Sequence, residues 1–149
     1  MLQNTYNFNQ SSVELEIIGL PDYSKDDNEK NISIISSWKL SIINKPEIQG
    51  NLDHLKCVIK AFYTFATTTL LERNERFESD FIDISLDKEG KFNLLLKSSK
   101  PGIKPLTIKL GSSEFADIIN CIDQLKVSDN IKLDFNELDP VIKKKNIYP

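Results

Sequence analysis

The single histidine is the side chain best suited to acid–base chemistry near neutral pH. His54 follows Asp53 directly, and a histidine beside a carboxylate can act as a general base when both line a substrate pocket. The sequence offers no recognisable nucleophile motif, glycine-rich phosphate loop or zinc-protease motif to complete such a site. We therefore interpret His54 as an exposed residue in the first turn of a helix, and we predict no catalytic residues.

Two clusters of carboxylates are the other candidates for a binding site. They comprise Asp22, Asp26, Asp27 and Glu29 in one segment, and Glu78, Asp80 and Asp83 in another. A calcium loop needs ligands at alternate positions and a glycine at the sixth, and the first cluster lacks this spacing. We interpret the first cluster as a solvated loop, and we predict neither a bound metal nor a cofactor.

The two cysteines, Cys57 and Cys121, both lie in predicted helices among apolar neighbours. We predict that both are reduced, buried core side chains, with a disulfide or a redox pair as the alternative. Two cysteines and one histidine are too few for most structural zinc sites, which need four such ligands.

Length and charge set the class of protein. The chain has 149 residues, of which 28% are charged, and its formal net charge is -3. This length fits one domain, and the acidic balance gives no global attraction to nucleic acid or to an anionic membrane. The first ten residues lack a basic start and an apolar run, and no long apolar segment follows. We therefore expect neither a secretory signal nor a membrane span, and hence a cytoplasmic protein.

The elements that must position these side chains can be predicted from hydrophobic periodicity, which indicates six strands and two helices. The expected strands are 6–18, 32–43, 82–86, 92–96, 106–110 and 131–135, and the expected helices are 51–72 and 112–126. Each helix carries one apolar stripe, which both helices could bury on one face of a single antiparallel sheet. We therefore predict an α+β two-layer sandwich of order ββαβββαβ. Residues 1–135 form the single domain and residues 136–149 form a C-terminal tail.

The predicted sheet has one apolar face and one mixed face. Alternation over 32–43 places Trp38 in the core, in line with Ile32 and Ile34. Apolar side chains on the opposite face suggest an interaction surface for another chain, which includes the possibility of a homodimer. The residues of this expected surface, with a basic run from the tail, are Ile35, Ile43, Leu95, Lys143, Lys144 and Lys145.

Several segments resemble a cyanobacterial family, domain of unknown function 4335. Tyr6 followed by the run Leu15–Leu20, LEIIGL, is similar to the start of that family. The segment Phe115–Leu125, FADIINCIDQL, resembles its last helix, and Gly50 followed by Leu52-Asp53-His54-Leu55 fits its order of elements. The resemblance implies a photosynthetic bacterial source, and it carries no known activity and no catalytic residues.

We expect a non-enzymatic accessory, assembly or regulatory factor that binds another protein. The first alternative is a single-stranded nucleic-acid-binding protein that uses Tyr6, Phe8 and Phe81 as stacking aromatics, although the acidic charge makes nucleic acid an unfavourable partner. The second alternative is a small-molecule enzyme that uses His54 with an acidic partner.

Overall fold

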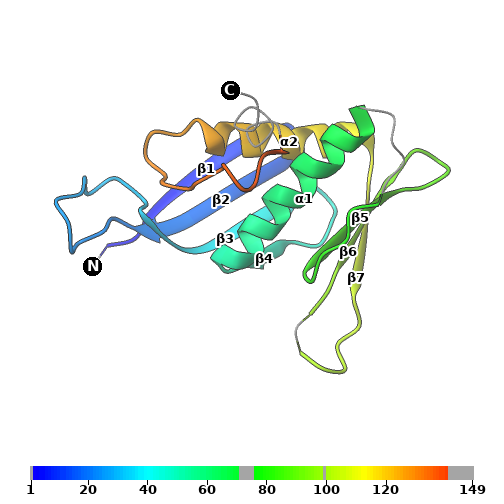
Figure 1. Cartoon of the computed structure of the whole chain (residues 1–149), viewed down its shortest axis with the longest axis horizontal. Coiled ribbons are helices and arrows are strands. Elements are labelled where there is room, and N and C mark those ends of the chain that lie inside the picture. Colours follow the sequence, from blue (N-terminus) through cyan, green and yellow to red (C-terminus); the bar gives the residue numbers. More distant parts are fainter. Residues whose placement is uncertain (1, 71–75, 99, 141–149) are drawn as a thin grey trace. The chain divides into compact units, whose positions relative to one another are not determined.

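The computed structural model describes residues 2–70, 76–98 and 100–140, and the chain divides into two compact units. The first unit contains residues 1–55 and 117–134, and the second contains residues 56–116 and 135–149. Figure 1 shows two helices and two separate sheets. The α+β class is therefore confirmed, but the prediction of one six-stranded sheet is wrong.

The first unit is built on a four-stranded antiparallel sheet with the order β1-β2-β3-β4. The strands are β1 (Asn4–Gln10), β2 (Val13–Leu20), β3 (Ile34–Ile42) and β4 (Ile48–Gly50). Alternate residues of β2 and β3 are buried, with Ile17 opposite Trp38 in the register. Trp38 is fully buried and its Nε1 donates to the carbonyl of Asn51 at 2.7 Å, so its assignment to the core is confirmed.

The segment 6–18, expected to form one strand, is a hairpin of two strands. The pairing of Gln10 with Val13 leaves Ser11 and Ser12 as the turn, and Ser11 has a positive φ of 29°. Ser12 donates to the carboxylate of Asp117 through its hydroxyl at 3.0 Å. A helix residue distant in sequence therefore helps to hold a turn that contains no glycine, proline or asparagine.

A β-bulge changes which residues of β3 face the core. Ile18 pairs with Ser37 but Gly19 pairs with Ile35, so Ser36 is the extra residue. As a result Ile35 is only 8% exposed, whereas Ile34 is half exposed. The prediction that Ile34 faces the core and Ile35 the opposite side is therefore wrong, because a one-residue bulge inverts the alternation.

The part of α2 (Ser112–Lys126) from Asp117 onward covers the apolar side of this first sheet, as Figure 1 shows. Cys121 lies against the β1–β2 hairpin, where its thiol is 3.3 Å from the carbonyl oxygen of Phe8. The expected strand 131–135 is wrong, since only Ile131 pairs, in a single parallel bridge with Ile32. This unit therefore packs a helix on a sheet in two layers.

The second unit contains a three-stranded antiparallel sheet with the order β5-β6-β7. Its strands are β5 (Ile82–Leu86), β6 (Phe92–Leu96) and β7 (Leu106–Leu110), as the sequence predicted. The turn between β5 and β6 closes where the amide of Gly90, at a positive φ of 80°, donates to the carbonyl of Asp87. Among the described residues, these strands form ladders with one another, and Ile84 of β5 also makes an isolated antiparallel bridge with Phe77.

Aromatic side chains form the core of the second unit. Phe65 of α1 (Leu52–Leu70) packs edge-on against Phe92 of β6, with ring centroids 5.9 Å apart. Phe92 stacks on Phe115 at 4.2 Å, and Phe62 lies 5.3 Å from Phe115. These rings join the helix to the sheet within the unit. The last two residues of the expected helix 51–72 lie outside the described residues.

Residues beyond 135 are described as far as 140. Leu138 and Asp139 are buried, and the amide of Asp139 donates to the carbonyl of Phe135 at 2.9 Å. The rest of the expected tail, residues 141–149, lies outside the described residues.

Candidate functional site

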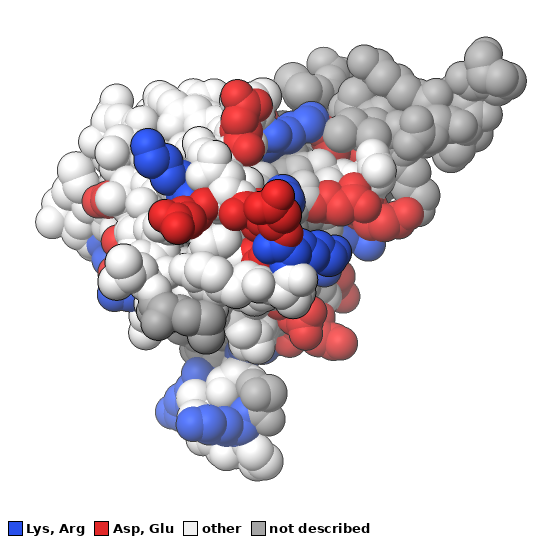
Figure 2. Space-filling view, turned by 90° about the vertical axis from the view of Figure 1, so that its left-hand side faces the viewer, with Lys and Arg blue, Asp and Glu red and all other residues white. Residues whose placement is uncertain are grey.

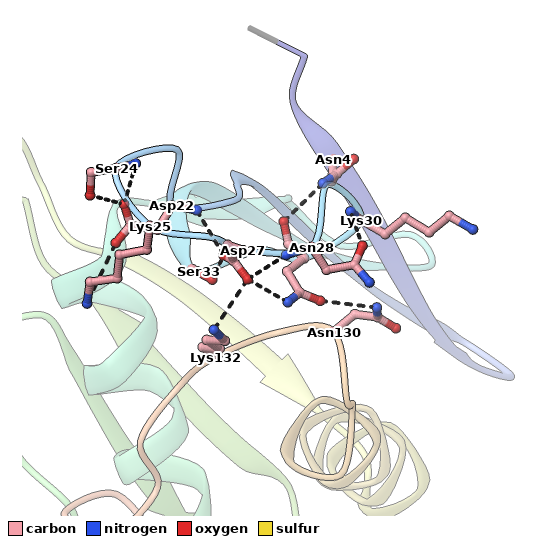
Figure 3. Close-up of polar contacts among 11 residues, drawn as sticks. Asn4, Asp22, Ser24, Lys25, Asp27, Asn28, Lys30, Ser33, Asn130 and Lys132 are labelled. Atoms are coloured by element: carbon pink, nitrogen blue, oxygen red, sulfur yellow. Dashed lines mark hydrogen bonds and ion pairs between the residues drawn. The ribbon is translucent and has the colours of Figure 1, made fainter.

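Asp27 is a polar side chain of the first unit with several hydrogen-bond partners (Figure 3). It lies in the loop between β2 and β3, and only 6% of its side chain is exposed. Its carboxylate accepts from the amides of Asp22 and Asn28, both at 2.9 Å. Further donors are the side chains of Asn31 at 2.8 Å, Ser33, and Lys132 at 3.4 Å. Asp27 therefore connects both ends of its own loop to the segment after α2.

This environment fixes the charge of Asp27. The amide of Asp22, the Ser33 hydroxyl and the Asn31 amide, in that order, hold the pKa of the carboxyl far below its ordinary value of 3.8. A group with so low a pKa carries no proton at neutral pH, so it cannot act as a general acid there. The geometry assigns Asp27 to ordering the loop.

Asp22, a second member of the first carboxylate cluster, is also engaged locally. Asp22 accepts from the amide and the hydroxyl of Ser24, and these bonds lower its pKa below the ordinary value. A hollow of about 310 Å³ lies here, and its lining includes Lys25 and Lys132 beside the acids. No set of three or more metal-ligating side chains suited to an ion occurs in the described part of the chain.

A second hollow lies at the end of the first sheet, where the β1–β2 and β3–β4 turns meet. It has a volume of about 450 Å³, and its lining residues are Asn9, Ser11, Ser12, Val13, Glu14, Ser41, Ile42 and Ile43. Ile43 is 61% exposed, and its amide donates to the carbonyl of Ser12 at 3.0 Å. We call this feature the Ile43 groove.

Strained backbone borders the Ile43 groove on two sides. Ser11 lines it with a φ of 29°, and Asn44, the residue after Ile43, has a φ of 62°. They are the two residues other than glycine with positive φ in the described chain. Such conformations cost free energy and are found preferentially at functional sites.

Carboxylates also surround this groove. Glu14 lines it, Glu47 accepts from the Ser41 hydroxyl at 3.1 Å, and Asp117 accepts from Ser12. The polar surroundings of the Ile43 groove therefore carry negative charge next to one exposed aliphatic side chain.

His54 caps a helix. The side-chain oxygen of Asn51 accepts from the amide of His54 at 3.0 Å, which is the bond of an N-cap residue to the third helical position. The His54 ring lies over Gly50, where an added Cβ would meet its Nδ1 at 2.6 Å. The prediction that His54 lies in the first turn of a helix is confirmed, but its side chain is half-buried there and not exposed as predicted.

The two cysteines differ in their surroundings, and both are free thiols. Cys121 is buried, and burial raises its pKa to about 11. Cys57 is half-buried, and its thiol donates to the hydroxyl of Ser79 at 3.4 Å. The core assignment is confirmed for Cys121 and holds in part for Cys57.

Of the second carboxylate cluster, Asp83 is the buried member. Burial by itself raises its pKa, but the Ser79 amide and the Lys97 ammonium outweigh burial and keep the pKa below its ordinary value. Lys97 Nζ lies 3.0 Å from Asp83 Oδ1 and also donates to the Ser79 carbonyl. Asp83 thus joins the start of β5 to the end of β6.

Within the first unit, the expected interaction residues Ile35 and Ile43 do not share an exposed surface. Ile35 is buried, which the β-bulge explains, and Ile43 borders the groove. Leu95 is half-buried on the polar face of the second sheet, where it pairs with Asp83 and Thr107. Lys143, Lys144 and Lys145 lie outside the described residues. The sequence pattern did not predict the Ile43 groove. The pair Ser11 and Ser12 is the local sequence signal for the turn between β1 and β2 that borders it.

Among the described residues, no helix combines the length and the apolar character that crossing a bilayer requires. Comparisons with curated proteins and with solved structures gave no match. The model of one family, described as a domain of unknown function (DUF4335), matches residues 6–147. This match covers nearly the whole chain, and the protein therefore belongs to the DUF4335 family.

Proposed function

We propose that this protein is a non-enzymatic binding factor of the cyanobacterial cytoplasm and that it binds a partner protein through the Ile43 groove. The observation that carries this proposal is the exposed side chain of Ile43 at the border of a groove of about 450 Å³. A single exposed aliphatic side chain is ordinary on a protein surface, but beside a concavity it offers an apolar contact that a bound segment can bury.

The lining of the groove indicates the chemistry of the partner. Ile43 offers one apolar contact, while the serine hydroxyls and Asn9 offer hydrogen bonds to a peptide backbone. Glu14, Glu47 and Asp117 favour a positive charge on the bound segment. The occupant is therefore an extended segment of another protein, with one apolar anchor next to a lysine or an arginine.

The backbone of the site supports recognition with little rearrangement. The Ile43 amide is bound to Ser12, and the Ser12 hydroxyl is bound to Asp117. These bonds fix the two turns that border the groove, so less ordering is required when a partner binds.

Site-specific photo-crosslinking in the native cell tests the proposal. A photoreactive residue at position 43 should crosslink a defined protein, and Glu14→Lys in the same chain should reduce that product about tenfold through charge repulsion. A photoreactive residue at Val127, which is exposed elsewhere in the first unit, is the matched control.

Three outcomes would contradict the proposal. They are equal products from positions 43 and 127, no effect of Glu14→Lys, and a crosslinked product that consists of two copies of this chain. The last result would assign the groove to a homodimer.

A further inference from the structure

The connection between β6 and β7 carries positive charge without a carboxylate of its own. Lysines occupy positions 97, 100, 104 and 109, and no Asp or Glu lies between Phe92 and Leu110. The whole chain, by contrast, has a formal net charge of -3. The net charge of this stretch of the second unit is therefore opposite in sign to the net charge of the whole protein.

Lys100 and Lys104 are the part of this charge that the fold leaves uncompensated. Lys97 Nζ lies 3.0 Å from Asp83, and Lys109 Nζ lies 3.6 Å from Asp87. Lys100 and Lys104 are exposed, and neither pairs with a carboxylate of the described chain. The lowest part of the surface in Figure 2 shows basic side chains and no acidic side chain.

Two aliphatic side chains accompany these lysines. Ile103 is 54% exposed and Leu106 is 42% exposed. Pro101 and Pro105 restrict the backbone on either side of Ile103. The connection extends past the strand ends of its own sheet in Figure 1, in agreement with the exposed fractions of these side chains. We call Lys100, Ile103, Lys104 and Leu106 the basic hairpin end.

We propose that the basic hairpin end binds the surface of an anionic lipid bilayer. Aliphatic side chains enter the boundary between headgroups and acyl chains, while lysines beside them are attracted to anionic headgroups. Each lysine near an anionic bilayer is attracted to the negative charge of its headgroups. The connection contains no arginine, and it has no aromatic side chain on which a nucleic-acid base could stack.

Flotation of the full-length protein with vesicles tests this proposal. Vesicles of equal parts phosphatidylglycerol and phosphatidylcholine should carry the protein upward, and vesicles of phosphatidylcholine alone should not. The combined substitution Lys100→Gln and Lys104→Gln should lower the partition coefficient roughly 30-fold, since each lysine contributes about fivefold. Ile103→Ser should lower it roughly tenfold, and added salt should weaken binding of the wild type.

The matched control removes two lysines from the opposite end of the same sheet. Lys88→Gln with Lys91→Gln, in the turn between β5 and β6, should leave the partition coefficient within about twofold of the wild type. An equal loss in the two double variants overturns the proposal, because it would show dependence on net charge alone. Absence of flotation with anionic vesicles also overturns the proposal. So does a protein that binds a single-stranded oligonucleotide through these lysines and does not bind vesicles.

Discussion

At the scale of single residues, Asp27 illustrates how a carboxylate can stabilise a loop that contains little apolar surface. Five donors converge on its two oxygens, four of them from its own loop. Each is a charge-assisted hydrogen bond, which is stronger than a bond between neutral groups. The loop from Asp22 to Ser33 therefore depends on the ionised form of one side chain.

Asp27→Asn should destabilise the protein, because the amide replaces one acceptor with a donor that faces other donors. The folded pKa of Asp27 lies below its ordinary value, so its contribution to stability is present above about pH 4 and is lost as the pH falls towards the folded pKa. The difference in melting temperature between wild type and variant should therefore be largest near pH 7 and should narrow below pH 4.

Thermal unfolding at a series of pH values measures this difference. Asp26→Asn, at the exposed neighbouring position, is the control and should change the melting temperature little. A difference for Asp27→Asn that stays constant down to the lowest pH would show that the ionised carboxylate is not responsible.

At the scale of elements, the β-bulge between β2 and β3 decides which side chains the sheet presents. The chains approach closely there: a Cβ at Gly19 would lie 2.2 Å from the Ile34 carbonyl oxygen and 2.5 Å from Ile32 Cγ2. A backbone atom cannot move aside as the end of a flexible side chain can. The glycine therefore permits the register that buries Ile35 and exposes Ile34.

Gly19→Ala should lower the free energy of unfolding by about 3 kcal/mol through this steric overlap. Gly111→Ala is a suitable control, since its added Cβ would meet its nearest neighbour, Glu114 Oε1, at 3.6 Å, which is ordinary contact. Urea denaturation of both variants measures the two changes. A loss below about 1 kcal/mol for Gly19→Ala would mean that the bulge can relax.

At the scale of the whole molecule, neither unit is a single continuous stretch of chain. The first unit takes its sheet from residues 1–55 and its helical cover from residues 117–134. Val13, Leu15 and Ile17 are buried, and residues 117–126 supply the helix on their sheet. A sheet without such cover would expose its apolar face to water.

A fragment of residues 1–55 should therefore lack a fixed fold, with poor dispersion of its amide resonances and strong binding of a hydrophobic dye. Adding a peptide of residues 112–134 should restore dispersion, because it supplies the missing helix. Well-dispersed resonances from 1–55 alone would show that the sheet is stable without α2.

Local periodicity sufficed to predict the α+β class, β5 to β7, α2, and the core positions of Trp38 and Cys121, since each follows from neighbours within a few residues. Tertiary contacts decided the rest. The turn at Ser12 is bound by Asp117, the phase of β3 depends on its bulge against β2, and five donors gather around Asp27 from Asp22 to Lys132. The alternation of apolar and polar residues shows which side chains of a strand share a face, but it does not show which strands pair. One sheet and two sheets are therefore equally compatible with the same pattern. The groove at Ile43 likewise exists only because two turns, separated in sequence by the two strands β2 and β3, are hydrogen-bonded to each other.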